Sequence, residues 1–126
     1  MALRCLIVDD SPRFVEAARG LLEREGIAVV GVASTSAEAL RRAEELKPDV
    51  TLVDVDLAHE SGFELVRRLH SQTSLKSSRA ILISTYAEED FADLISGSPA
   101  AGFLSKCDLS ARAIREILDI TADDLG

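Results

Sequence analysis

The stretch "LIVDD" (residues 6–10) joins a run of core-type aliphatic residues to two adjacent carboxylates, Asp9 and Asp10. Two carboxylates at the end of a buried segment repel each other, so a compensating positive charge must lie nearby. A metal cation, a lysine or the solvent can supply that charge. The stretch therefore predicts a buried strand that ends at a charged site.

Outward from this stretch, apolar runs and helical patterns alternate five times along the chain. This alternation is typical of parallel strands joined by crossover helices, and strands that are covered on both faces form near-continuous aliphatic runs. The expected strands are residues 3–8, 27–33, 50–55, 79–84 and 102–106. The sequence thus predicts an α/β domain with a (βα)5 pattern.

Local signals mark the first two expected helices. Ser11 can cap a helix that has Pro12 in its first turn and that ends near Gly26. Thr35 and Glu38 have the spacing of a capping box at the start of the second helix. We expect both helices to begin at these residues.

The later helices carry weaker signals. Apolar residues at helical spacing predict helices through residues 63–69 and 110–118. Between the fourth and fifth strands, Gly97 and Pro99 permit only a short helix, because both residues disfavour a helix interior. We therefore expect this fourth helix to be the weakest element of the fold.

Length and composition indicate one folded domain. The chain has 126 residues, of which 47% are hydrophobic and 29% charged, a profile that fits a compact protein with a core. No apolar run approaches the roughly 18 residues of a membrane span, and the first residues lack the apolar segment of a signal peptide. We expect a single cytoplasmic domain over residues 1–126, without a membrane segment.

Charge and cysteine content exclude further classes of function. The net charge is −8 and no basic cluster stands out, which argues against direct nucleic-acid binding by this chain. Cys5 lies in an apolar run and Cys107 follows a lysine, so their spacing matches neither a metal motif nor a disulfide framework. Both are expected to be reduced thiols.

Polar residues follow the expected strands at the edge where ligands collect in parallel α/β sheets. The candidates are Asp9 and Asp10 after the first strand, Asp54 in the third, Ser84 and Thr85 after the fourth, and Lys106 at the fifth. Three neighbouring carboxylates require a hard cation, and Mg²⁺ prefers oxygen ligands. A carboxylate beside Mg²⁺ is also a competent nucleophile toward phosphorus, with the lysine and the hydroxyl available to bind phosphoryl oxygens.

These motifs resemble the receiver domains of two-component response regulators over essentially the whole chain. In that family an acidic pair follows the first strand, a phospho-accepting aspartate ends the third, a Thr or Ser ends the fourth, and a lysine follows the fifth. "VDD", "LVDVDL", "LIST" and "FLSK" supply these motifs here. The separations of 44, 30 and 22 residues between Asp10, Asp54, Ser84 and Lys106 also agree with the family.

The resemblance implies a fold and a metal site. The fold would be a flavodoxin-like, doubly wound parallel sheet with strand order 2-1-3-4-5. Asp54 would be the phosphorylation site and would share a Mg²⁺ ion with Asp10, a direct ligand, and Asp9, which would act mainly through bound water. The backbone carbonyl of Asp56 would complete the protein ligands.

The resemblance also implies residues that bind the phosphoryl group and report its presence. Lys106 and Ser84 would contact phosphoryl oxygens, with Ser84 acting as a switch hydroxyl. Phe103 stands where the family places its switch aromatic, although a tyrosine is more common there. Gly62 matches the glycine that follows the phosphorylation loop.

Three positions depart from the family pattern. Ala58 and Cys107 stand where prolines are usual, which removes some rigidity from two loops without removing chemistry. Pro99 replaces a common glycine before the fifth strand, so the shape of the fourth helix is not settled by the resemblance.

The implied function is that of a phosphoacceptor signalling domain. A sensor histidine kinase or a phosphotransfer protein would phosphorylate Asp54, and a conformational shift would control an output. Apart from Mg²⁺-dependent self-phosphorylation and slow autodephosphorylation, the domain would not be an enzyme. A homodimer through the fourth helix, fifth strand and fifth helix is also expected. "LISTYAEED" and "GFLSK" resemble receivers attached to helix-turn-helix transcription factors, so the chain is interpreted as a stand-alone regulator or as part of such a protein.

Other interpretations remain open at this point. "TLVDVDL" has two aspartates two apart, as in haloacid-dehalogenase-like phosphatases, but Ala58 replaces the Thr or Val of that family and Asp9 and Asp10 would lack a purpose. A pseudo-receiver that only binds partners is disfavoured because every expected residue is present. Taken singly, the candidates have ordinary explanations as cap, turn or core residues. His59 and His70 are assigned no chemistry.

Overall fold

The computed structural model describes residues 2–57, 59–72 and 78–118. Its centre is a five-stranded parallel sheet in the order β2-β1-β3-β6-β7. The strands are β1 (Arg4–Val8), β2 (Ala28–Ala33), β3 (Val50–Asp54), β6 (Arg79–Ser84) and β7 (Gly102–Ser105). Because β6 and β7 are the fourth and fifth strands of this sheet, the predicted flavodoxin-like order 2-1-3-4-5 is confirmed.

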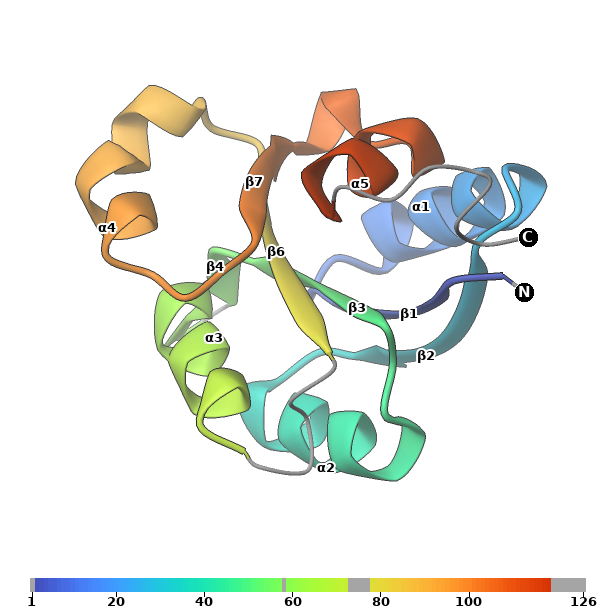
Figure 1. Cartoon of the computed structure of the whole chain (residues 1–126), viewed down its shortest axis with the longest axis horizontal. Helices are drawn as coiled ribbons and strands as arrows, with labels where there is room; N and C mark the ends of the chain where they lie inside the picture. Colours follow the sequence, from blue (N-terminus) through green and yellow to red (C-terminus); the bar gives the residue numbers. More distant parts are fainter. Residues whose placement is uncertain (1, 58, 73–77, 119–126) are drawn as a thin grey trace.

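Four of the helices cover the two faces of the sheet (Figure 1). Helices α1 (Pro12–Arg24) and α5 (Ala111–Leu118) pack on one face, and α2 (Ser36–Leu46) and α3 (Gly62–His70) on the other. Alternate residues of β1 belong to different cores: Cys5 and Ile7 join the cluster under α1 and α5, whereas Leu6 and Val8 join the cluster under α2 and α3. A strand buried on both faces must be apolar at every position, which explains the continuous aliphatic runs.

The predicted helix caps are confirmed. Ser11 Oγ accepts the Phe14 N–H and Pro12 is the first residue of α1, where its missing N–H costs nothing. In α2, Thr35 Oγ1 accepts the Glu38 N–H, and Glu38 Oε1 accepts the Ser34 N–H in return. The bonds donated by Phe14 and Glu38 satisfy N–H groups that the first helical turn leaves without partners, and the bond donated by Ser34 fixes the chain just before α2.

The fourth helix is as short as the sequence predicts. Helix α4 (Ala92–Ser96) has five residues and follows a single 3-10 turn, Glu88–Phe91; neither element contains a buried residue. Gly97 is its C-cap, and Leu94 is 55% exposed. In Figure 1, α4 lies beside the β7 edge of the sheet rather than over one of its faces.

Two local features were not predicted. The loop after Asp54 contains a small antiparallel hairpin formed by β4 (Asp56–Leu57) and β5 (Glu60–Ser61). The fifth strand ends at Ser105, so Lys106 begins a 3-10 turn, Lys106–Asp108, instead of closing the strand. Ala58 lies outside the described residues, and the consequence expected of it for loop rigidity is therefore not addressed.

Within the described ranges, no helix has the length and apolar character needed to cross a membrane.

Candidate phosphoacceptor and metal site

The parallel sheet brings three candidate carboxylates together at the carboxyl ends of its strands. Asp9 follows β1 and Asp54 ends β3, and these two strands are direct neighbours with Val8 opposite Val53. One carboxylate oxygen from each of Asp9, Asp10 and Asp54 lies within 4.8 Å of the others. Asp9 and Asp54 are buried, whereas Asp10 is exposed.

Lys106 supplies the compensating positive charge that the "LIVDD" stretch requires. Its Nζ lies 2.6 Å from Asp9 Oδ2 and 3.3 Å from Asp54 Oδ2. The same ammonium lies 4.4 Å from the centre of the Phe14 ring, a distance at which a cation is attracted to an aromatic face. One ammonium against three carboxylates still leaves an excess of negative charge.

Backbone N–H groups orient the two buried carboxylates. Asp9 Oδ1 accepts the Ser11 N–H at 2.8 Å, and Asp54 Oδ1 accepts the Asp56 N–H at 3.1 Å. Each aspartate therefore has one oxygen held by the backbone two residues further on, and its second oxygen turned toward Lys106. This arrangement fixes the side chains without using the oxygens that face the shared space.

A divalent cation fits this donor set. Asp9 Oδ2 is buried against the Lys106 ammonium at 2.6 Å, so one positive charge is shared by two buried carboxylates, with the Asp10 carboxylate close by. Hard oxygen ligands that carry excess negative charge are those that Mg²⁺ selects.

The pKa of Asp54 lies above the ordinary value of an aspartate. Burial is the main cause and the Asp9 carboxylate adds to it, while the Asp56 N–H and Lys106 oppose the shift. Protonation of Asp54 thus favours the folded chain, and this contribution is lost as the pH rises through the raised pKa. The ionised form of Asp54 is therefore held at a cost in the folded chain, which a bound cation would reduce.

Ser84 ends β6 beside the site and is 1% exposed. Its Oγ accepts the Tyr86 N–H at 3.0 Å, which leaves the hydroxyl hydrogen free to donate elsewhere. Ser84 does not cap the helical segment that follows, because the N-cap of the 3-10 turn Glu88–Phe91 is Ala87, without a side-chain cap hydrogen bond.

Phe103 lies in the core, 9% exposed, within a group of rings called here the aromatic cluster (Phe63, Tyr86, Phe91 and Phe103). Phe91 is its centre, at 5.8 Å from Phe63, 6.4 Å from Tyr86 and 6.2 Å from Phe103 between ring centroids. Such distances suit favourable edge and tilted aromatic pairs. The cluster links the start of α3, the 3-10 turn before α4, and β7.

Sequence analysis missed Phe14, Phe91 and Glu60. The contacts of Phe14 with Lys106 and of Phe91 with three rings join segments far apart in the chain, so no local pattern announces them. Glu60 Oε1 accepts the Ser36 N–H at the start of α2. The local signal in the sequence for Glu60 was its position in a polar loop that follows the candidate residue Asp54.

The side chains of the other titratable residues singled out in the sequence do not join the carboxylate cluster. Asp56 and His59 are exposed on the hairpin, and His70 is exposed in the last turn of α3, where a cation is favourable. Cys5 and Cys107 are free thiols, the first buried and the second exposed. Burial raises the pKa of the Cys5 thiol to about 12.

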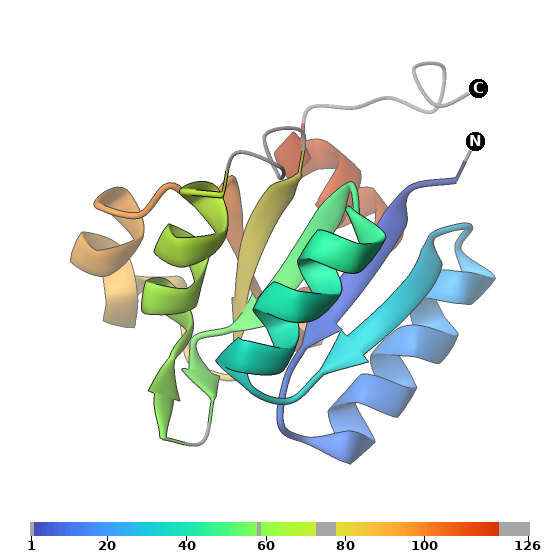
Figure 2. The same ribbon diagram turned by 90° about the horizontal axis from the view of Figure 1, so that it is seen from below.

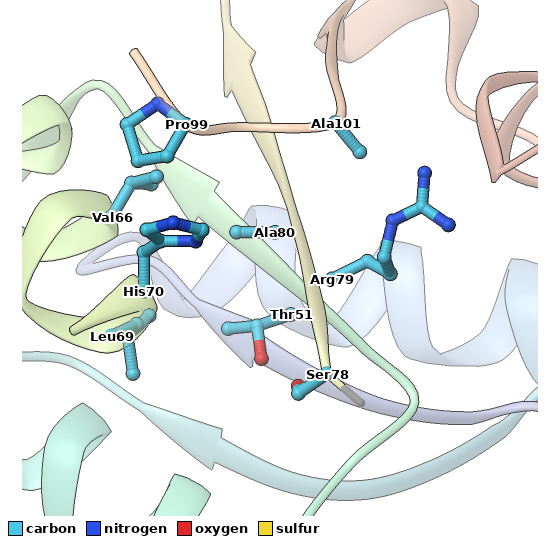
Figure 3. Close-up of a pocket in the computed structure, with 9 residues that line it drawn as sticks. All are labelled: Thr51, Val66, Leu69, His70, Ser78, Arg79, Ala80, Pro99 and Ala101. Atoms are coloured by element: carbon cyan, nitrogen blue, oxygen red, sulfur yellow. The ribbon is translucent and has the colours of Figure 1, made fainter. Parts of the chain in front are cut away.

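A cavity of about 160 Å³ lies at the amino ends of the strands, where β3 and β6 begin and opposite to the end that carries the carboxylates (Figure 3). Thr51, the last turn of α3 around His70, Arg79 and Pro99 contribute to its lining. None of the candidate carboxylates, Ser84 or Lys106 lines it, so it is separate from the site described above.

Comparison with known proteins gives the family. Residues 5–119 match the model of the response regulator receiver domain, so the chain belongs to that family. It is 35% identical over 121 residues to the response regulator GacA of Pseudomonas aeruginosa, covering 91% of this chain and 55% of GacA. The chain spans about half the length of most curated relatives it matches.

Solved structures agree with this assignment. A two-component response regulator of the LuxR family from Aurantimonas sp. SI85-9A1 has a TM-score of 0.83 and 28% identity, covering 99% of this chain and 94% of that one. A response regulator from Burkholderia pseudomallei, solved with a phosphorylated aspartic acid, a calcium ion and citrate, has a TM-score of 0.78 and 25% identity, covering 98% and 69%. The chain is therefore a receiver domain of two-component signalling with a flavodoxin-like fold.

Proposed function

We propose that this chain accepts a phosphoryl group on Asp54 from a histidine kinase or phosphotransfer protein. The observation that carries the proposal is the convergence of Asp9, Asp10 and Asp54 within 4.8 Å, with Lys106 in contact with Asp9 and Asp54. The buried carboxylates of this acidic cluster are oriented by backbone N–H groups. Such an arrangement is better explained by a reactive site than by a purely structural role.

The transfer requires one bond to form and one to break. A carboxylate oxygen of Asp54 attacks phosphorus while the bond from phosphorus to the donor nitrogen breaks, and the electron pair returns to the donor imidazole. The product is an acyl phosphate on Asp54. Asp54 Oδ1 accepts the Asp56 N–H and Oδ2 accepts a hydrogen bond from the Lys106 ammonium, so the carboxylate is held in one orientation for this attack.

Mg²⁺ would be held by the carboxylates of Asp10, Asp54 and, mainly through water, Asp9, together with the carbonyl of Asp56. When bound, the ion neutralises negative charge on the carboxylates and the incoming phosphoryl group. Lys106, already within 3.3 Å of Asp54, would contact a phosphoryl oxygen by charge, and the Ser84 hydroxyl would donate a hydrogen bond to another. The relative from Burkholderia pseudomallei, with its phosphorylated aspartate and calcium ion, supports this arrangement.

The phosphorylated state would be reported through Ser84 and Phe103. A hydrogen bond from Ser84 to the phosphoryl group would draw that hydroxyl toward Asp54 and bias the packing of Phe103 and the aromatic cluster. The affected surface would include α4, β7 and α5, which we propose also as a homodimer face. Exposed Leu94 on α4 is consistent with a contact surface there.

The scope of the proposal is one receiver domain over residues 1–126, acting in the cytoplasm without contacting nucleic acid itself. Its own chemistry would be limited to Mg²⁺-dependent phosphorylation and slow hydrolysis. Membership in the receiver family sets aside the haloacid-dehalogenase-like phosphatase. The pseudo-receiver remains the rival, and it predicts the same fold with no phosphoryl transfer.

Intact mass spectrometry tests the proposal. Incubation with acetyl phosphate and Mg²⁺ should add one phosphoryl group, and the adduct should disappear in Asp54→Asn and in EDTA. Asp93→Asn, which removes an exposed carboxylate on α4, should leave the adduct unchanged. An adduct that survives both Asp54→Asn and EDTA would overturn the assignment, and its absence from the wild-type protein would favour the pseudo-receiver.

A further inference from the structure

The hairpin after Asp54 is attached to a second helix by one side chain. Glu60 Oε1 accepts the backbone N–H of Ser36 at 2.9 Å, across 24 residues of sequence. Ser36 is the first residue of α2, and its N–H is one of those that the helix itself leaves without a partner. A carboxylate is well suited to this position, because the N-terminal end of a helix carries partial positive charge.

The hairpin connects the Glu60–Ser36 hydrogen bond to the Asp54 carboxylate. In the β4–β5 ladder, Leu57 lies opposite Glu60 and Asp56 lies opposite Ser61. The Asp56 N–H in turn holds Asp54 Oδ1 at 3.1 Å. A series of contacts therefore runs from the start of α2 through the hairpin to Asp54, and Figure 2 shows the hairpin beside the beginning of α2.

The base of the hairpin is packed against the backbone of Asp54 and Val55. A Cβ at Gly62 would collide with the Asp54 carbonyl oxygen and lie 2.8 Å from Val55 Cα. The Gly62 N–H donates to the Val55 carbonyl at 3.0 Å, which closes the loop at its base. The base of the hairpin is thus closed at Gly62, and its second strand, β5, is held to α2 through Glu60.

We infer that Glu60 is a positioning residue for phosphoryl transfer: by holding the hairpin to the N-terminus of α2, it fixes the Asp56 N–H that orients Asp54. The expected effect of Glu60 on phosphorylation rests on the proposed function, whereas its expected effect on the hairpin does not. Removing the accepting oxygen should allow Asp56 to move and Asp54 to leave its reactive orientation. Displacements of about 1 Å at such positions can cost up to about a hundredfold in rate.

The experiment compares four variants with the wild-type protein. Glu60→Ala removes the accepting oxygen, and Glu60→Gln keeps it without the charge. Glu64→Ala removes an exposed carboxylate in the first turn of α3, whose ion pair in the described part of the chain is with Arg67 at 3.7 Å. Thr35→Ala weakens the start of α2 without touching the hairpin, so it separates helix stability from attachment. The readouts are amide hydrogen exchange at Asp56 and the rate of phosphorylation by acetyl phosphate at saturating Mg²⁺.

In Glu60→Ala, exchange at the Asp56 amide should be about tenfold faster, since protection reports local opening, and phosphorylation should be about tenfold slower. Glu60→Gln should restore most of both, and Glu64→Ala and Thr35→Ala should match the wild type. Unchanged Asp56 exchange in Glu60→Ala, equal effects of Thr35→Ala, or an unaltered phosphorylation rate would each overturn the inference. If the wild-type protein takes up no phosphoryl group, the proposed function fails, while Asp56 exchange still decides the attachment.

Discussion

The two sides of the site differ in how firmly the fold holds them. On the β1–β3 side, Asp9 and Asp54 are buried, oriented by backbone N–H groups and paired with Lys106. On the β6–β7 side, the 3-10 turn and α4 contain no buried residue, and Tyr86 and Leu94 are 60% and 55% exposed. The comparison indicates that the charges lie on rigid elements, whereas the neighbouring segment can shift at a small cost in free energy.

The two cysteines give the largest contrast between these sides. Burial raises the pKa of Cys5 in β1 from 9.0 to about 12, so at pH 8 it has about a thousandth of the thiolate of an ordinary thiol. Cys107, next to Lys106, is exposed. Because Cys5 is also fully buried, iodoacetamide should alkylate the exposed Cys107 faster by several orders of magnitude. Peptide mass spectrometry measures both rates, urea should make them similar, and comparable rates in the folded protein would contradict the rigid β1 side.

Lys106→Met should destabilise the charged side strongly. The variant leaves Asp9 and Asp54 buried without their counter-charge, so the free energy of unfolding in EDTA should fall by about 3 kcal/mol. Mg²⁺ should restore part of this loss, because it would replace the missing positive charge. Urea denaturation with and without Mg²⁺ measures both effects. Arg112→Met, at an exposed ion pair on α5, serves as control and should cost less than about 1 kcal/mol.

The weakly packed side should respond to the phosphoryl group through Ser84. Beryllofluoride, which mimics a phosphoryl group on an aspartate, should shift the amide NMR signals of residues 94–109 in the wild-type protein. Ser84→Ala should remove most of these shifts, since the hydroxyl that would contact the phosphoryl group is gone. Ser71→Ala, remote from the site at the end of α3, is the matched control. Persistent shifts in Ser84→Ala would show that another residue carries the coupling.

The smallest expected effect concerns the lifetime of the phosphoryl group. Asp56 and Tyr86, each two residues beyond a site residue, flank the path expected for attacking water. The Tyr86 ring can screen that water, whereas the Asp56 carboxylate could either orient it or repel the phosphoryl charge, so only Tyr86 has a predicted direction. Tyr86→Ala should shorten the lifetime several-fold, roughly 1 kcal/mol in barrier height.

The decay of the adduct after removal of acetyl phosphate measures this effect. Tyr86→Phe keeps the ring and should decay at the wild-type rate. Tyr86 also packs edge-on against Phe91, so a purely structural role is the competing explanation. That explanation predicts lower stability of Tyr86→Ala with unchanged decay.

Sequence alone determined the alternation of the five sheet strands with their crossover helices and the membership of the charged cluster. The strands are buried on both faces, so their aliphatic runs are unambiguous, and Ser11 and Thr35 mark helix starts by chemistry that acts over three residues. Because parallel strands end at one edge, Asp9, Asp54 and Lys106 could be placed together before any coordinates existed. The weakness of α4 followed from Gly97 and Pro99 in the same way.

Only the tertiary structure decided how the members of that cluster are paired and supported. The approach of Lys106 to Asp9 Oδ2, the Phe14 ring beside Lys106, the aromatic cluster around Phe91 and the Glu60–Ser36 hydrogen bond all join separate elements. Such contacts depend on how each helix is rotated on the sheet and on which rotamer fits the space left by its neighbours. Local propensity acts over a few residues and carries no information about either, so these contacts appear only once the whole chain is packed.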